Sequence, residues 1–221
     1  MSRSLNIDAK DVYRQLGYPV NATPDGDTRY RVAEVIDELL VTAKPRSIKI
    51  EFIQTDLESI LVGKDISRHL VRCQHCLVLA TTLGSQIDTL IRKVSVNDMN
   101  AAVLMDAAAS VLIENVVEKL ETQARQEYEE AERYLTSRFS PGYGDFPIRI
   151  QNELLRLMDA GRKIGLYATP SHILTPRKSI TAVCGLSTEP VKGHLAGCDT
   201  CTLAADCQYK KEGMTCARKH I

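Results

Sequence analysis

Four cysteines near the C-terminus form the densest group of metal-binding residue types in the chain. They are Cys198, Cys201, Cys207 and Cys216. Four thiolates suit either a structural zinc ion or an iron–sulfur cluster such as 4Fe-4S. Their spacing matches neither the common zinc ribbon nor the standard ferredoxin run, and Cys184 or His194 could replace one ligand. The spacing therefore leaves an iron–sulfur cluster, a zinc ion and free thiols open.

A separate Cys-x-x-Cys pair is formed by Cys73 and Cys76. A redox-active pair usually opens a helix that follows a strand, whereas this pair precedes the strand predicted at residues 75–81. The chain has seven cysteines in all, and an odd number argues against a disulfide framework. We predict that Cys73 and Cys76 are core thiols.

Residues 138–147 form a rigid loop that could hold a ligand. The prolines and glycines that exclude a helix or a strand here are Pro141, Gly142, Gly144 and Pro147. Such a loop is either a plain connector or a ligand cradle, because glycines let backbone amides approach a bound molecule. Arg138 can bind a carboxylate through two parallel N–H donors, and Tyr143 offers a ring face for stacking.

Composition excludes several functional classes. The 221 residues carry 28 basic and 28 acidic side chains, so the net charge of zero argues against a nucleic-acid binder. The most apolar window, residues 101–113, is shorter than the 20 or so residues of a membrane span and contains Asp106. The N-terminus has no apolar signal core. We therefore expect a cytoplasmic protein without a membrane segment.

The hydrophobic periodicity predicts helices and strands in alternation. Helices are predicted at residues 7–16, 28–44, 87–94, 97–133 and 148–160, the last closed by Gly161. Strands are predicted at residues 47–54, 75–81, 166–168 and 180–185, with a hairpin partner at residues 57–62. The helix at 97–133 dominates, and its later half is expected to be solvated. The pattern predicts an α+β fold in which helices flank a twisted, mainly antiparallel sheet.

Two separated motifs resemble a known family. The segment Arg138-x-x-Pro-Gly-Tyr143-x-x-x-Pro147 resembles the Arg-x-x-x-Gly-Tyr-Pro motif of the activation domain of cobalamin-dependent methionine synthase, which binds S-adenosyl-L-methionine (AdoMet). Residues 164–179 are similar to that family's Gly-x-x-Leu-Thr-x-Ser-x-x-Met-x-Pro-x-x-Ser pattern. A weaker third match joins residues 80–84 to the Ala-rich helix that runs to Glu114. The resemblance covers most of residues 7–186 and implies the fold of that activation domain.

The resemblance also implies a binding site for AdoMet. Arg138 would hold the methionyl carboxylate and Tyr143 would pack on the ligand, while Glu114 would bind its amino group. The remaining implied contacts are Pro141, Gly142, Gly144, Thr169 and Ser171. No catalytic side chain is implied, because the cobalt centre is the nucleophile and the protein supplies position and electrostatics.

The sequence departs from the family motifs at three places. Gly144-Asp-Phe-Pro147 stands where the family has Pro-Ala-Cys-Pro, and Thr169-Pro-Ser171 stands where it has Thr-Glu-Ser. The family's aromatic pair after the Ser-Val-Ser-Gly strand is Val183-Cys184 here. These departures bear on AdoMet affinity more than on the fold.

The resemblance implies a role in the reactivation of oxidised cobalamin. The chain lacks the Asp-x-His-x-x-Gly cobalamin motif, so we expect a stand-alone activation subunit that acts on a corrinoid-binding methionine synthase subunit. A flavodoxin- or ferredoxin-like electron donor is also implied. We divide the chain into an activation domain at residues 1–188 and a Cys-rich tail at residues 189–221.

Two other functions stay open at this point. One is the reductive activation of a different corrinoid methyltransferase, with an iron–sulfur tail as the electron relay. The other is a non-enzymatic, metal-stabilised binding protein that keeps the fold but has lost AdoMet.

Overall fold

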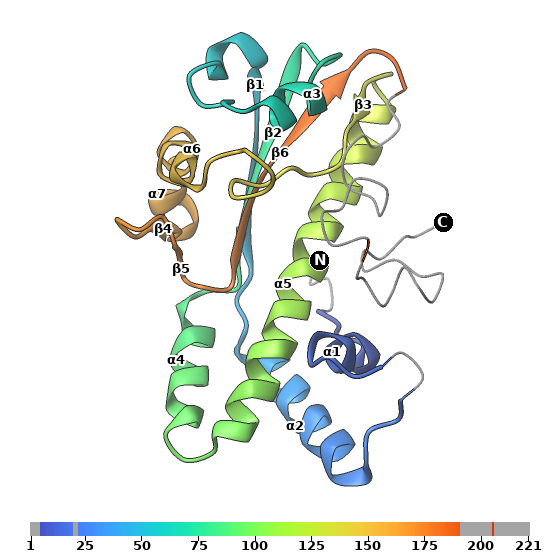
Figure 1. Ribbon diagram of the computed structural model, residues 1–221, viewed down its shortest axis with the longest axis vertical. Helices are drawn as coiled ribbons and strands as arrows, with labels where there is room; N and C mark the ends of the chain where they lie inside the picture. The colour runs from blue at the N-terminus through green and yellow to red at the C-terminus, as the bar shows by residue number, and fades with distance from the viewer. Residues whose placement is uncertain (1–4, 20–21, 191–204, 206–221) are drawn as a thin grey trace.

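The computed structural model describes residues 5–19, 22–190 and 205 and shows an α+β domain (Figure 1). The α-helices are α1 (Ala9–Gln15), α2 (Gly26–Thr42), α3 (Lys64–His69), α4 (Ser85–Ser95), α5 (Met99–Glu129), α6 (Gln151–Leu157) and α7 (Ala160–Ile164). The strands are β1 (Arg46–Ile53), β2 (His75–Thr82), β3 (Tyr134–Leu135), β4 (Tyr167–Ala168), β5 (Leu174–Thr175) and β6 (Ser179–Ser187). Two short 3-10 turns are η1 (Gln54–Leu57) and η2 (Ile148–Ile150).

Four of the strands form one antiparallel sheet in the order β1-β2-β6-β3. The central strand β2 pairs along its whole length with both neighbours, and β4 and β5 form a separate two-stranded hairpin. Side chains alternate across β2, so that Leu77 and Leu79 face one side of the sheet while Val78 and Ala80 face the other. All four are buried, and the sheet therefore lies between two apolar layers.

The long helix α5 organises one side of the molecule. Asp98 caps its N-terminus by accepting a hydrogen bond from the Ala101 amide at 2.9 Å. Its N-terminal half packs with α1, α2 and α4 in one apolar cluster, and its C-terminal half covers the sheet through Ala124 and Tyr128. Figure 1 shows α5 running along the sheet and continuing down to the helices at its lower end.

The opposite face of the sheet is covered by α3, α6, α7 and the residues around the 138–147 loop. Phe146, from that loop, is among the largest fully buried side chains of the domain. It packs in the same cluster as Leu154 of α6 and Val78 of β2. The 138–147 loop therefore contributes a side chain to the core as well as residues to the surface.

Several predicted elements differ from the structure. Residues 57–62 do not pair with β1, because the chain turns through η1 and then enters the unpredicted helix α3. The predicted helix at 148–160 is broken at Asp159, whose φ of 53° lies in the left-handed region. Gly161 does not end a helix but lies inside α7, where a Cβ would meet the Tyr167 ring, and Gly165 ends that helix.

The later half of α5 is not the fully solvated segment that the sequence predicts. Several of its charged residues are exposed, but Glu121 is largely covered and Ala124 is completely buried against the sheet. The cause is periodicity, since one apolar residue per turn is enough to keep a charged helix in contact with a sheet. The prediction of a long helix itself is confirmed.

Among the described residues, α5 alone is long and apolar enough to cross a membrane by length and composition. Its apolar stretch is therefore longer than the window at residues 101–113. However, 56% of its most apolar window is buried inside the domain, as in the core helix of a soluble protein.

Candidate functional site

Arg138 lies where the loop begins, beside the long helix α5. Its Nε donates a hydrogen bond to Glu121 Oε2 at 2.7 Å, and both Nη atoms lie 3.4 Å from Glu114 Oε2. The side chain is only 24% exposed, which leaves one edge of the guanidinium at the surface. The structure thus brings the two predicted residues Arg138 and Glu114 together.

The charges around Arg138 favour its cationic form. Burial alone would lower the pKa of the Arg138 guanidinium, but the carboxylates of Glu114 and Glu121 outweigh it and raise that pKa. Glu114 is 60% exposed on its side chain, whereas Glu121 is 16% exposed. One acid is therefore fixed beneath the arginine and the other lies at the surface.

Glu121 is a site residue that the sequence alone does not single out. It lies in the charged second half of α5, where a carboxylate is ordinarily solvated. Its spacing from Glu114 is seven residues, which places both on one side of a helix. That spacing is the available signal, although it does not reveal that Arg138 folds back against this side.

The loop presents Tyr143 at the surface and anchors itself beneath. The Tyr143 side chain is 56% exposed and meets the Phe139 ring edge-on, with 5.7 Å between ring centroids. Phe139 is buried and also packs on the His69 ring. The contact with the buried Phe139 therefore fixes the position of the exposed Tyr143 ring.

The glycines of the loop are required by its path. Gly142 has a φ of 92° and donates its N–H to the Phe146 carbonyl at 2.8 Å. Gly144 has a φ of 53°, and a Cβ at this position would lie 2.4 Å from Asp65 Oδ2. Pro141, which directly precedes Gly142, is buried. Both positive φ values favour glycine, and a side chain at either position would also approach a neighbouring side chain.

The departure from the family motif at Gly144-Asp-Phe-Pro147 has a structural explanation. Asp145 caps α3 by accepting hydrogen bonds from the Lys64 and Asp65 amides at 2.7 Å and 3.0 Å. Phe146 fills the core below. Asp145 thus fastens the loop to α3, and Phe146 fastens it to the core.

Thr169 and Ser171 lie elsewhere. They share a hydrogen bond of 2.9 Å within the β4–β5 hairpin, which packs with α6 and α7 on the side of the sheet away from α5. The structure does not bring them to Arg138. Their role as ligand contacts stays a prediction, and the candidate site around Arg138 does not include them.

The buried cysteines behave as core residues. Burial raises the pKa of Cys73, and burial together with Cys73 raises the pKa of Cys76 to about 12. Burial also raises the pKa of Cys184, and the nearby charge of Glu121 raises it further. All three are neutral thiols at pH 7, and a neutral buried thiol is a poor metal ligand.

The four cysteines of the tail, Cys198, Cys201, Cys207 and Cys216, lie outside the described residues. Within the part of the chain that the structure describes, no three Cys, His, Asp or Glu side chains lie close enough to hold a metal ion.

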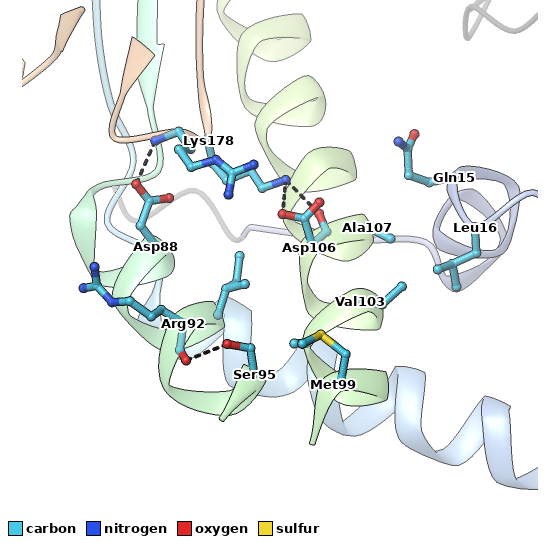
Figure 2. A pocket seen from close by; sticks show the side chains of 13 residues that line it. Gln15, Leu16, Asp88, Arg92, Ser95, Met99, Val103, Asp106, Ala107 and Lys178 are labelled. Atoms are coloured by element: carbon cyan, nitrogen blue, oxygen red, sulfur yellow. Dashed lines mark hydrogen bonds and ion pairs between the residues drawn. The ribbon is translucent and has the colours of Figure 1, made fainter. Parts of the chain in front are cut away.

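A cleft of about 640 Å³ lies at the other end of α5 (Figure 2). It is bordered by α1, α4, the first half of α5 and residues 177–178. Lys178 lies 2.9 Å from Asp106 Oδ1, and the Arg177 amide donates to Asp88 Oδ2 at 2.8 Å. Both carboxylates of the cleft are thus engaged, and none of the predicted site residues lines it.

A solved structure has the same fold. It is the crystal structure of the MetH reactivation domain bound to AdoHcy, and its TM-score with this chain is 0.62 at 15% sequence identity. The match covers 95% of this chain and 82% of that one. The predicted fold class is confirmed. No curated protein matches the chain.

A family model identifies the sequence more directly. The model for the activation domain of vitamin B12-dependent methionine synthase matches residues 68–192, which is more than half of the chain. The matched segment holds Glu114, Arg138 and the whole 138–147 loop. The chain belongs to the family of vitamin B12-dependent methionine synthase activation domains.

Proposed function

We propose that this protein binds AdoMet between α5 and the 138–147 loop and presents its methyl group to a corrinoid. The observation that carries the proposal is the surface edge of Arg138, which faces the exposed carboxylate of Glu114. The similar solved domain, which has AdoHcy bound, supports the same assignment.

Arg138 and Glu114 together suit the amino-acid end of AdoMet. An α-carboxylate can take the place of Glu114 on the two Nη donors, since a guanidinium fork matches the two oxygens of a carboxylate. Glu114 then becomes available to the α-ammonium group. The Glu114 carboxylate lies 3.4 Å from Arg138 Nη2 and is exposed, so a small movement of Glu114 would free the Nη edge of Arg138 for the ligand.

Tyr143 and the loop backbone suit the nucleoside end. The exposed tyrosine ring offers a face of the kind on which bases stack. The glycine-rich turn exposes backbone groups that can hydrogen-bond to the ligand. The family's aromatic pair is replaced by the buried Val183 and Cys184, so Tyr143 carries more of the stacking here.

The chemistry belongs to the bound groups. When bound, the corrinoid would supply the nucleophile for the methyl group of AdoMet, and a separate donor would supply the one electron that reactivation requires. The residues of this chain orient the ligand, neutralise its carboxylate at Arg138 and place a negative charge at Glu114 near the cationic sulfonium. No proton transfer is required of any side chain.

The proposal includes partners. A corrinoid-binding component is implied by the family, and we place the corrinoid on a domain or protein outside this 221-residue sequence. The electron would come from a flavodoxin- or ferredoxin-like donor in the cytoplasm. Neither nucleic acid nor a membrane is part of the proposal.

The test is a calorimetric titration of AdoMet into the anaerobically purified protein. We expect saturable binding that Arg138→Ala weakens by about 2 kcal/mol, the typical loss for a hydrogen bond to a charged group. The matched control is Arg162→Ala, which removes an 81%-exposed arginine that is also paired with an aspartate but lies on α7. Wild-type protein that fails to bind AdoMet, or equal effects of the two substitutions, would contradict the proposal.

The four tail cysteines support a second activity, the relay of an electron to the corrinoid through a 4Fe-4S cluster. Anaerobically purified protein should then contain iron and sulfide, and Cys198→Ser with Cys201→Ser should abolish both. Stoichiometric zinc without iron would instead indicate a structural site. A protein with neither metal would leave the tail as free thiols.

A further inference from the structure

Glu121 differs from Glu114 although both lie on the same side of α5. Glu121 is 16% exposed and Glu114 is 60% exposed. Glu121 is also closer to Arg138, with its Oε2 at 2.7 Å from Nε against 3.4 Å for Glu114 from the Nη atoms. The buried carboxylate thus makes the shorter contact, and it does so on the inner side of the guanidinium.

Glu121 is itself fixed by a second arginine. Its Oε1 accepts a hydrogen bond from Arg125 at 3.0 Å. Arg125 also donates to the backbone carbonyls of Leu135 and Thr136, at 3.2 Å for Thr136. The carboxylate is therefore held from α5 and from the strand that leads into the 138–147 loop.

This arrangement limits how the Arg138 fork can turn. A guanidinium is planar, and a hydrogen bond at Nε leaves the edge that carries the two Nη groups pointing the other way. In this structure that edge faces Glu114 and the surface. Without Glu121, the side chain would sample several rotamers and would lose entropy on binding a carboxylate.

We propose that Glu121 is a positioning residue that presents the Nη edge of Arg138 to the α-carboxylate of the ligand. The inference rests on the proposed AdoMet site. The fixed orientation of Arg138 makes the site selective for sulfonium nucleosides that retain an amino-acid carboxylate. Glu121 touches no ligand atom and acts only through Arg138.

A purely structural role for Glu121 makes a different prediction. If it only fastens α5 to the loop, then its loss weakens every ligand of the site equally. If it positions Arg138, then its loss weakens only ligands that carry a carboxylate. Decarboxylated AdoMet, which lacks that group and is otherwise identical, separates the two roles.

The experiment compares Glu121→Gln with Glu129→Gln, which makes the same change at an exposed position of the same helix. We expect Glu121→Gln to weaken AdoMet about tenfold or more, as for a lost bond to a charged group, and to change the affinity for decarboxylated AdoMet less than about threefold. Glu121→Asp, which keeps the charge, should recover part of the loss. Equal losses for both ligands, or none, would overturn the inference.

A second measurement needs no ligand and separates this inference from the proposed function. In a 15N NMR spectrum, the Arg138 Nε–H of the wild-type protein should give a slowly exchanging signal that Glu121→Gln removes and Glu129→Gln retains. A mobile Arg138 in the wild-type protein would overturn the positioning role. A fixed Arg138 in a protein that does not bind AdoMet would overturn only the ligand assignment.

Discussion

At the scale of single residues, the path of the 138–147 loop favours glycine at position 144. Gly144 combines a φ of 53° with a Cβ position 2.4 Å from Asp65 Oδ2, in the contact that fastens the loop to α3. A side chain here is therefore both strained and in collision. The same residue lies next to Tyr143, so its conformation bears directly on the proposed site.

We predict that Gly144→Ala destabilises the domain by about 2 kcal/mol, since strain in the left-handed region and a steric clash add together. Gly17→Ala is the control, because Gly17 has a φ of 85° but nothing lies within 4 Å of its Cβ position. Urea denaturation followed by circular dichroism measures both. Equal losses would show that the contact with Asp65 relaxes freely.

At the scale of elements, the C-terminal end of α5 is tied to the sheet by one carboxylate. Glu51 of β1 receives hydrogen bonds from Arg133 at 2.6 Å and from the Tyr128 hydroxyl at 3.0 Å, and His75 Nδ1 lies 2.8 Å away. The hydrogen bonds from Arg133 lower the pKa of Glu51 below its ordinary value of 4.5, although burial opposes this. The ionised carboxylate therefore stabilises the folded state.

This pKa predicts a loss of stability in acid. A group with a lowered pKa in the folded state contributes stability above its unfolded pKa and loses that contribution as the pH falls through the folded value. The loss attributable to Glu51 should thus begin below about pH 4.5. Glu51→Gln should be less stable at pH 7 and should lose less stability between about pH 5 and pH 3. The measurement is the free energy of unfolding at each pH, and an unchanged acid slope would contradict the assignment.

The elements also show which features are readable from a sequence. Strand β2 and helix α5 are predictable, because a continuous apolar run and a long helical stripe are strong local signals. The helix α3 is missed, since its six residues are held by Asp145 from a distant loop. The resemblance implies that Arg138 and Glu114 belong to one site, whereas their pairing and the role of Glu121 are revealed only by the fold.

At the scale of the whole molecule, two apolar layers share the same strands. Leu79 of β2 belongs to the layer beneath α5, while Val78 beside it belongs to the layer beneath α6. If one layer opens, then the strands that form the floor of the other lose their support. The domain is therefore built to unfold as one unit.

We predict a single unfolding transition that circular dichroism and tyrosine fluorescence report identically. Leu79→Ala and Leu154→Ala remove completely buried side chains from opposite layers. Each should cost about 2–5 kcal/mol and shift both signals together. A variant that moves only one signal would show that the layers unfold separately.

The position of the two acids on α5 has a further consequence for how this segment can change in evolution. Glu114 and Glu121 lie two turns apart, or about 10.5 Å along the helix axis, and both face Arg138. A residue inserted or deleted between them would rotate one acid by about 100° away from the arginine. The segment between Glu114 and Glu121 should therefore tolerate no change of length.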